Sequence, residues 1–424
     1  MQRNYGKISV KELLGTFFKT SRVIIHMESS DKMEEKALFP GSTIGIIGES
    51  SNGIMLAEAA KKMGFKVIAY NSDEAAPTMQ EADLGVVGSL HSKAKLQDFA
   101  ERCDLVTYES DKVSSDVIEA IGQYTKVPQG SEPLEITQDR LLERAFLEQM
   151  NINIAPYATI VSLDDIYQAI GSIGYPCVLK PIQKGFGRKR QQVINRQSDI
   201  AKCADIIDLG TYVLEAWIPY EKELSVIIGK EFDGKLNFFP IVENIYRDHH
   251  LFQSITKSQL EADVQAEVHR IATEIATQLD YVGVLEIAFF LTKSGSLYVK
   301  RIVPALHKAG FVFEKATNIS MFELHLRALS RMPIPQVRFV QPTVMVAIKN
   351  EDLEPLRTQW VLKDNWFYRF YRYPQTKRMV NPGYLLVLAE TTTAAIHQIE
   401  ATNIWSDTSS EGEEPNETVD EDTQ

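Results

Sequence analysis

Cysteine is scarce in this chain of 424 residues. The three cysteines, Cys103, Cys177 and Cys203, are widely spaced and form no C-x-x-C pair, which excludes a disulfide framework and argues against a thiolate zinc site. Such usage is typical of a reducing compartment, so we expect a cytoplasmic protein. Long apolar runs are also missing. None approaches the ~20 residues of a membrane-spanning helix, and residues 13–25 are too interrupted by charge for a signal peptide.

Basic charge is in deficit. Lysine and arginine number 45 against 57 aspartates and glutamates, so the net charge is −12. Residues 406–424 hold eight of the acids and no base, so −12 minus −8 leaves only −4 for the rest. Without a long Lys/Arg stripe we expect no nucleic-acid partner, because phosphate neutralisation supplies most of that affinity. The tail itself cannot bury apolar surface, and we expect it to be disordered.

Several familiar catalytic motifs are absent. The chain has no G-x-x-x-x-G-K-[ST] loop, and Gly45 and Gly48 lack the spacing of the dinucleotide fingerprint. It has no G-x-S-x-G elbow for a serine nucleophile. His249 and His250 are adjacent, so they cannot both face one metal from a regular element, and no H-x-x-x-H pair exists. These absences leave a site built from residues distributed along the chain.

The first convincing pattern is a βαβ unit. Strand 42–47 leads into a loop with Gly48 and Gly53, then a helix at 57–63 and a second strand at 66–70. The unit predicts a doubly wound parallel sheet.

The same pattern recurs with a helix at 94–102 and a strand at 105–108, which ends in Glu109. Because open α/β sheets place ligand groups at the carboxyl ends of parallel strands, Glu109 is a site candidate. A solvated loop acid remains the alternative interpretation of this residue.

A second α+β segment follows a helix from Arg140 to about residue 150. A short apolar strand at 176–180 ends in Lys180 and has its expected partner at 191–195. The loop between them, residues 184–190, is basic and carries glycines, a combination that can wrap phosphates with backbone N–H groups and lysines. A hairpin tip with solvated lysines is the alternative.

The later helices and strands are predicted in the same way, from hydrophobic periodicity and turn residues. We expect strands at 212–217 and 224–228, a helix at 260–279, a hairpin of strands 282–291 and 296–303, strands at 344–348 and 385–388, and a helix at 393–400. The predicted organisation is an N-terminal extension (1–40), an N-terminal α/β domain (41–150), a central α+β domain (151–335), a small C-terminal β-rich domain (336–405) and the acidic tail (406–424).

These segments, in this order, resemble the ATP-grasp superfamily and, within it, the 5-(carboxyamino)imidazole ribonucleotide synthetases. The resemblance extends over about residues 40 to 400. It is carried by residues 40–48, 106–109, 138–140, 174–180, 223–227, 242–244 and 279–284, with Pro304 and His307. It implies an ATP-grasp fold, ATP-dependent carboxylation of aminoimidazole ribonucleotide with bicarbonate in purine biosynthesis, and a homodimer.

The resemblance also implies roles for individual residues. Lys180, Lys189 and His307 would act in catalysis. ATP would be bound by Arg140, Lys180, Gly185, Phe186, Lys189, Gln191, the linker Glu215, Ala216, Trp217 and Ile218, and Glu223, which would accept from the ribose hydroxyls. Aminoimidazole ribonucleotide would be bound by Gly48, Gly53, Glu109, His307, Lys377 and Arg378.

The chain departs from the family pattern where magnesium is expected. The resemblance places one magnesium-binding glutamate at Ala288 and an Asn–Glu pair at Lys300 and Arg301. We therefore expect ATP as a ligand but predict no metal ligands in this chain. The first loop also carries an acid, Glu49, where a ribonucleotide phosphate is expected. Two interpretations stay open: an active ATP-dependent ligase, and a non-catalytic paralogue that binds nucleotide.

Overall fold

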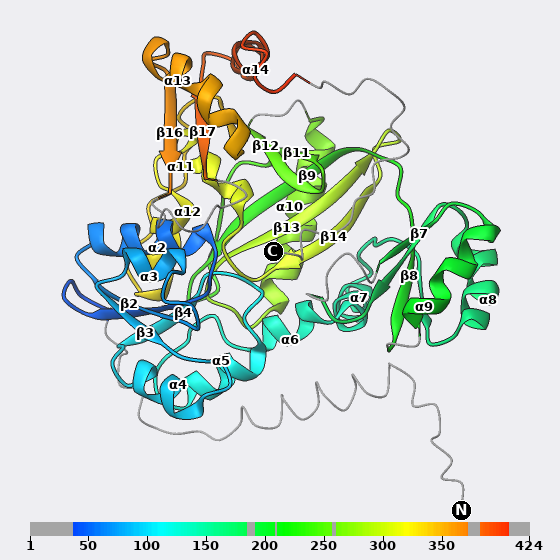
Figure 1. The fold of residues 1–424 in the computed structure, drawn as a ribbon, viewed down its shortest axis with the longest axis horizontal. Coiled ribbons are helices and arrows are strands. Elements are labelled where there is room, and N and C mark those ends of the chain that lie inside the picture. Colours follow the sequence, from blue (N-terminus) through cyan, green and yellow to red (C-terminus); the bar gives the residue numbers. More distant parts are fainter. Residues whose placement is uncertain (1–36, 185–190, 208–209, 257–259, 372–381, 407–424) are drawn as a thin grey trace, which may run out of the picture. The chain divides into compact units, whose positions relative to one another are not determined.

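The computed structural model describes residues 37–184, 191–207, 210–256, 260–371 and 382–406, and all elements below belong to the unit Leu38–Gln424 (Figure 1). None of the helices in these ranges combines the length and apolar character needed to cross a bilayer. The expected 1–40 extension lies outside them except for its last four residues, and so do all but the first residue of the acidic tail.

The N-terminal sheet is parallel, as the sequence predicts, and the structure gives its strand order as β3-β2-β1-β4. Its strands are β1 (Thr43–Ile47), β2 (Lys66–Asn71), β3 (Leu84–Val87) and β4 (Leu105–Tyr108). Its helices are α2 (Ser51–Lys62), α3 (Pro77–Glu81), α4 (Lys93–Ala100) and α5 (Ser115–Gly122). Apolar side chains of β1 and of α2 share one buried cluster, which places the helix on the sheet.

Helix α2 begins six residues before its predicted start. The Ser50 hydroxyl accepts from the Asn52 amide at 3.2 Å and caps the helix. Gly53, predicted to lie in the preceding loop, is therefore inside the helix, and that prediction was wrong. A Cβ at Gly53 would lie 1.9 Å from Oγ1 of Thr78, so the glycine is needed for the close approach to α3.

A second, antiparallel sheet has the order β5-β8-β6-β7. The predicted pairing of residues 176–180 with 191–195 is confirmed by the register Cys177↔Ile194. The strands are β5 (Tyr157–Ile160), β6 (Cys177–Pro181), β7 (Gln192–Ile194) and β8 (Tyr212–Ala216). The helices around it are α6 (Glu132–Gln138), α7 (Arg140–Gln149), α8 (Leu163–Ile173), η2 (Gln197–Cys203) and α9 (Ala204–Ile207).

The largest sheet has nine strands in the order β14-β13-β9-β11-β12-β15-β17-β16, with β10 beside β9. Its strands are β9 (Tyr220–Lys230), β10 (Leu236–Phe238), β11 (Val242–Arg247), β12 (His250–Thr256), β13 (Gly283–Thr292), β14 (Leu297–Val303), β15 (Thr343–Ile348), β16 (Trp366–Phe370) and β17 (Gly383–Leu388). The predicted hairpin around residues 293–295 is β13–β14.

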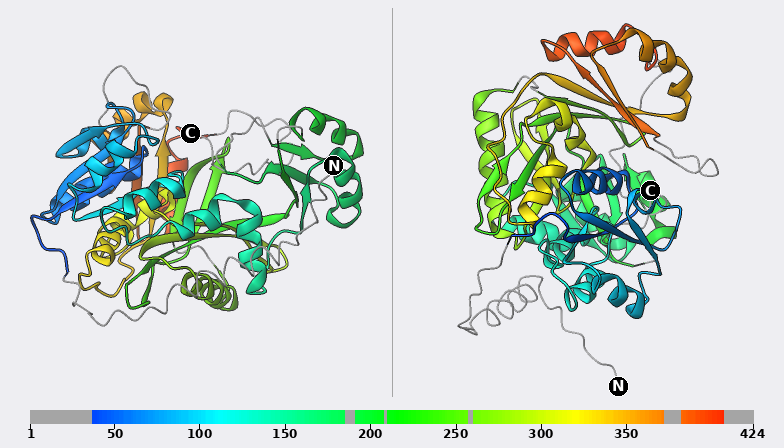
Figure 2. Two further views of the ribbon diagram at one scale, coloured as in Figure 1. Left: turned by 90° about the horizontal axis from the view of Figure 1, so that it is seen from below. Right: turned by 90° about the vertical axis from the view of Figure 1, so that its left-hand side faces the viewer.

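The C-terminal strands do not form a sheet of their own. β15 pairs with β12, so the strands assigned by sequence to residues 336–405 continue the central sheet. Helices α13 (Leu353–Leu362) and α14 (Thr392–Glu400) pack on these strands around a separate apolar cluster (Figure 2). The remaining helices are α10 (Ala262–Gln278), η3 (Lys308–Val312), α11 (Phe313–Ala316), α12 (Met321–Leu329) and η4 (Asn350–Asp352). The division into segments stays a prediction.

Removal of the acidic tail tests the prediction, made from its composition, that it does not pack on the rest of the protein. Deletion of residues 406–424 is expected to leave the melting temperature unchanged, because the sequence there has almost no apolar surface to bury. Deletion from residue 404 also removes Trp405, whose carbonyl accepts from Nη1 of Arg247 at 2.7 Å and whose ring packs against the C-terminal cluster. This longer deletion should lower the melting temperature by a few degrees. A large drop from the shorter deletion would contradict the prediction.

Candidate functional site

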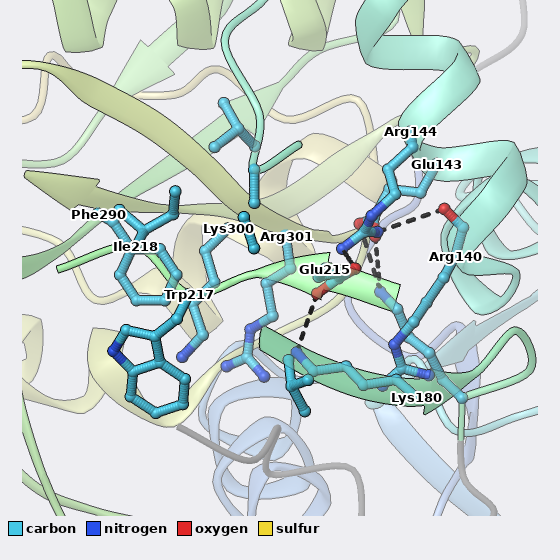
Figure 3. Close-up of a pocket in the computed structure, with 15 residues that line it drawn as sticks. Arg140, Glu143, Arg144, Lys180, Glu215, Trp217, Ile218, Phe290, Lys300 and Arg301 are labelled. Carbon is cyan, nitrogen blue, oxygen red and sulfur yellow. Dashed lines mark hydrogen bonds and ion pairs between the residues drawn. The ribbon is translucent and has the colours of Figure 1, made fainter. Parts of the chain in front are cut away.

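A cavity of ≈ 670 Å³, including the part open to solvent, lies among α7, β6, the segment after β8, and the β13–β14 hairpin (Figure 3). We call it the main cavity. Its lining residues are Arg140, Glu143, Arg144, Ala155, Val178, Lys180, Lys184, Glu215, Ala216, Trp217, Ile218, Phe290, Val299, Lys300 and Arg301.

The main cavity is strongly basic. Six of its lining side chains are cationic and two are carboxylates, a formal excess of four positive charges. The six cations are Arg140, Arg144, Lys180, Lys184, Lys300 and Arg301. Such a surface favours a polyanion, since fixed charges in a partly enclosed site are screened less than on an open surface.

Glu215 organises one side of the wall. Its carboxylate pairs with Arg144 and lies 3.2 Å from Nζ of Lys180, so it lies between the two cations (Figure 3). All three side chains are at most one-tenth exposed. Arg140, almost completely buried, donates from Nη1 to the Pro181 carbonyl at 2.9 Å. The cations are thus held in fixed positions, which reduces the entropy lost when an anion binds.

Glu143 connects helix α7 to two other parts of the wall. Its Oε1 accepts from the Ile302 amide of β14 at 2.8 Å. Its Oε2 lies 3.2 Å from Nζ of Lys184, the first residue of the basic loop 184–190. The side chain is 1% exposed, so this carboxylate stabilises the cavity wall and does not reach solvent.

The segment after β8 offers a hydrogen-bonding backbone edge. The amides of Ala216 and Trp217 donate to the carbonyls of Pro156 at 2.9 Å and Pro176 at 3.1 Å. Within the described residues no acceptor is found for the Ile218 amide. The Trp217 and Ile218 side chains and the Phe290 ring line the same end of the cavity. A planar apolar ligand with an acceptor at its edge fits this end.

A β-bulge brings two cations from β14 into the cavity together. Ala288 faces Arg301, but the next residue of β13, Phe289, faces Val299, so Lys300 has no partner on β13. In a regular strand, consecutive side chains point to opposite faces. The bulge breaks that alternation, and both Lys300 and Arg301 line the main cavity (Figure 3).

Lys300 is paired with Glu223 of β9. Its Nζ lies 2.8 Å from Oε1 of Glu223, and the two side chains are 9% and 1% exposed. The ammonium also lies 4.8 Å from the Tyr246 ring centroid and 5.4 Å from that of Phe290, within range of a cation–π interaction. Oε2 of Glu223 is buried and has no hydrogen-bond partner among the residues that the structure describes.

Arg301 lies beside His307 and Glu286. Its Nη2 is 2.9 Å from Nε2 of His307 and 3.9 Å from Oε2 of Glu286. Because a guanidinium has only donors, we assign Nε2 of His307 as the acceptor. Its Nδ1, 3.0 Å from Oε1 of Glu286, then carries the ring proton and donates it to that carboxylate. In this tautomer Nδ1 has no lone pair for the Ala309 amide, which lies 3.3 Å away.

The Glu286 carboxylate is fully buried and remains ionised. Burial alone raises the pKa of Glu286, but the interaction with His307, the positive charge of Arg301 and the hydrogen bond from Ser225 outweigh it and lower the pKa to about 2. Asn244 in turn donates to the Ser225 hydroxyl at 2.7 Å. The buried Glu286 carboxylate is therefore already in contact with His307, Arg301 and Ser225.

The residues present do not fit a magnesium ion. Magnesium prefers an octahedral set of oxygen ligands, and Ala288 offers only a methyl group. No group of three or more His, Cys, Asp or Glu residues that could hold a metal is found in the part of the chain that the structure describes. The two nearby carboxylates, Glu223 and Glu286, already face Lys300 and Arg301. The absence of metal ligands in this chain stays a prediction.

A second cavity, of ≈ 460 Å³ including open space, lies at the carboxyl ends of β1 and β2. We call it the first-loop cavity. It is lined by Ile47, Gly48, Glu49, Tyr70, Asn71, Ser72, Leu90, Ser110, Lys112 and Val113. This is the edge of a parallel sheet at which ligand groups are expected.

Glu109 lies beneath the first loop, is fully buried and does not line this cavity. It accepts from the Ser50 amide at 2.7 Å and from the Ser50 hydroxyl. Burial and the negative charge of Glu49 raise the pKa of Glu109, although the Ser50 hydrogen bonds act against this. Gly48, with φ +144°, is required here because a Cβ would lie 2.2 Å from Oε1 of Glu109. Glu109 therefore holds the loop after β1 in place through its hydrogen bonds with Ser50.

Comparison with known proteins connects this geometry to a family. The model of the ATP-grasp domain matches residues 145–322, and that of the ribonucleotide synthetase preATP-grasp domain matches residues 42–138. The N5-carboxyaminoimidazole ribonucleotide synthase of Bacillus subtilis (strain 168) is 30% identical over 88% of this chain and 98% of its own length. This chain belongs to the N5-carboxyaminoimidazole ribonucleotide synthase family.

Solved structures of the family have the same fold. The ADP complex of an N5-carboxyaminoimidazole ribonucleotide synthetase matches with a TM-score of 0.83 and 29% identity, covering 88% of this chain and 98% of that chain. The Staphylococcus aureus enzyme in complex with ADP matches with a TM-score of 0.81 and 27% identity, covering 88% and 100%. The predicted ATP-grasp fold with an N-terminal parallel sheet is confirmed.

Six residues with roles implied by the synthetase family come together in the main cavity. They are Arg140, Lys180, Glu215, Ala216, Trp217 and Ile218. Glu223 and His307 lie behind the wall, in contact with Lys300 and Arg301. Gln191 is described but does not line the cavity. Gly185, Phe186, Lys189, Lys377 and Arg378 lie outside the described residues.

Two charged wall residues have no counterpart among the sequence predictions. Glu143 and Arg144 follow Arg140 by three and four positions on α7, so all three lie on one face of the helix. That spacing was readable from the sequence. Their contacts with Glu215, Lys184 and Ile302 were not.

Proposed function

We propose that this chain binds ATP in the main cavity and, as in its family, carboxylates 5-aminoimidazole ribonucleotide with bicarbonate. The observation that supports this proposal most strongly is that one cavity joins an end lined by Trp217, Ile218 and Phe290 to a wall with six cations. Two relatives with the same fold are complexes with ADP. Adenine is neutral and the triphosphate is an anion, so each part of the nucleotide has a matching surface.

The adenine ring would lie beside Trp217, Ile218 and Phe290, with the Ile218 amide as the donor to its edge. The phosphates would meet Lys180 and Arg140, which Glu215 and the Pro181 carbonyl already hold in place. In this arrangement the nucleotide does not have to order flexible lysines as it binds.

The acceptor substrate would lie in the first-loop cavity, next to Gly48. In the proposed reaction a bicarbonate oxygen attacks the γ-phosphorus and ADP leaves, which gives carboxyphosphate. The exocyclic amine then attacks the carboxyl carbon and phosphate leaves. In this proposal Gly53 permits the close packing of α2 on α3, and Glu109 holds the loop that faces the substrate through its hydrogen bonds with Ser50.

A non-catalytic nucleotide-binding protein is the second candidate. It is favoured by two contacts, one between Lys300 and Glu223 and one between Arg301 and Nε2 of His307. Glu223 and His307 are expected to bind ligands, and in this structure these contacts occupy them. Release of ADP that depends on both aminoimidazole ribonucleotide and bicarbonate separates the candidates. Product formation supports the ligase, whereas nucleotide binding without turnover supports the second candidate. Homodimer formation and a cytoplasmic location stay predictions, the first testable by light scattering.

Replacing Lys180 by alanine is expected to weaken ATP binding by about 1.5–3 kcal/mol, the range for a hydrogen bond to a charged group. Calorimetric titration of the full chain measures this directly. Lys202→Ala is the matched control, because Lys202 is largely exposed, pairs with Asp199 and is not part of the cavity wall. Equal losses in both variants, or no nucleotide binding by the unaltered protein, would reject the ATP site.

A further inference from the structure

Two side chains of β14 occupy the position at which the family resemblance expects metal ligands. Lys300 and Arg301 are consecutive, yet the bulge beside Phe289 lets both line the main cavity. Each also faces a buried carboxylate behind the wall, Glu223 for Lys300 and Glu286 for Arg301. The cations are therefore built into the wall and are not solvated surface charges.

We infer that Lys300 and Arg301 take the place of a divalent cation, so that the main cavity binds its nucleotide as the metal-free polyanion. This inference rests on the proposed ATP site and goes beyond it by specifying the ionic form of the ligand.

The nearby carboxylates are already neutralised within the protein. Glu223 and Glu286 are each 1% exposed, and each has a cation of β14 beside it. For either carboxylate to coordinate a metal, a buried ion pair would have to open, and separating such a pair costs several kcal/mol. The contact between Arg301 and His307 would have to open as well.

Repulsion between like charges points in the same direction. The lining holds six cations and two carboxylates, and the two carboxylates behind it, Glu223 and Glu286, leave two positive charges in excess, six minus four. A free triphosphate finds only cations at the Lys300 and Arg301 positions of the lining. A dication next to Lys300 and Arg301 would instead meet two like charges in a site of reduced dielectric, where repulsion is strong.

The two cations are also positioned rigidly enough to serve as phosphate donors. Lys300 is fixed by Glu223 and by the faces of two aromatic rings, Tyr246 and Phe290. Arg301 offers a planar fork of donors that matches phosphate oxygens. Only 6% of Arg301 is exposed, which limits its alternative positions.

Calorimetric titration of the full chain with ATP and with ADP, in EDTA and in excess magnesium, tests the inference. We expect ATP to bind in EDTA and to bind about tenfold more weakly when magnesium is in excess. Binding of ATP that requires magnesium, or is tighter with it, would overturn the inference while leaving the ATP site intact. Absence of binding in both buffers would overturn the proposed site and this inference with it.

Variants identify the residues responsible. Lys300→Gln and Arg301→Gln should each weaken binding of free ATP by about tenfold or more and should reduce the difference between the two buffers. Lys222→Gln is the matched control, since Lys222 precedes Glu223, pairs with Glu243 at 2.8 Å and does not line the cavity.

The double variant Lys300→Gln with Glu223→Gln separates a folding defect from a binding defect, because it removes both charges of the buried ion pair. This double variant should stay folded by thermal melting and should keep the weakened binding of free ATP. Restored wild-type binding in it would show that Lys300 serves only to neutralise Glu223, and would overturn the role assigned to it.

Discussion

Replacing Lys300 by methionine is expected to lower the free energy of unfolding by about 3–5 kcal/mol. Methionine retains much of the side-chain volume but removes the ammonium, so the 1% exposed Glu223 carboxylate loses its partner at 2.8 Å. Within the described part of the chain, the other oxygen of Glu223 already lacks a hydrogen-bond partner. An uncompensated buried charge of this kind is among the most destabilising single changes in a protein. Urea unfolding at neutral pH measures the loss.

Two further variants show whether the loss comes from this pair. Adding Glu223→Gln to Lys300→Met should recover most of the stability, because a neutral amide is much less costly to bury than an unpaired carboxylate. Lys222→Met is the control, since its pair with Glu243 is about one-quarter exposed and should contribute only about 0–1 kcal/mol. A loss in Lys300→Met as small as in the control would mean that the pair does not form.

Acidification is expected to destabilise the protein through His325, with about 1.4 kcal/mol lost per pH unit from this residue between about pH 6 and pH 4. His325 on α12 is fully buried. The Val284 amide donates to its Nδ1 at 2.9 Å, and its Nε2 lies 2.9 Å from Oγ1 of Thr107. Since the Thr107 hydroxyl donates to Gln129, Nε2 carries the single ring proton. A second proton would have to face the Val284 N–H.

The direction of this pH dependence follows from the direction of the pKa shift of His325. Burial lowers the pKa of His325 from 6.5 to about 3 in the folded protein. Between these values the unfolded chain binds a proton that the folded chain does not, so stability is full above pH 6.5 and falls as the pH falls. In His325→Asn, which keeps a donor and an acceptor, the dependence of urea stability on pH should be flatter by this amount. The exposed His397→Asn is the control, and equal slopes in all three proteins would contradict the prediction.

Much of the site could be foreseen because the relevant residues follow strands and glycine loops whose patterns are local. Lys180 ends a short apolar strand, and the pairing of that strand with residues 192–194 followed from the loop between them. The start of α2 was misplaced because its first turn contains Gly53, a residue that breaks helices on average. Its close contact with Thr78, 25 residues away in helix α3, favours glycine there instead.

The sequence by itself determined the family, the parallel N-terminal sheet and the set of cationic residues, because these depend on residue identity and short-range periodicity. The resemblance to the family added that Ala288 stands where a glutamate is expected, and Lys300 and Arg301 where an Asn–Glu pair is expected. Only the tertiary structure decided what the replacements do. Strand alternation predicts that Lys300 and Arg301 face opposite sides, and the bulge in β14 reverses this. Their carboxylate partners come from β9 and β13, and such pairings depend on strand register, which no local pattern specifies.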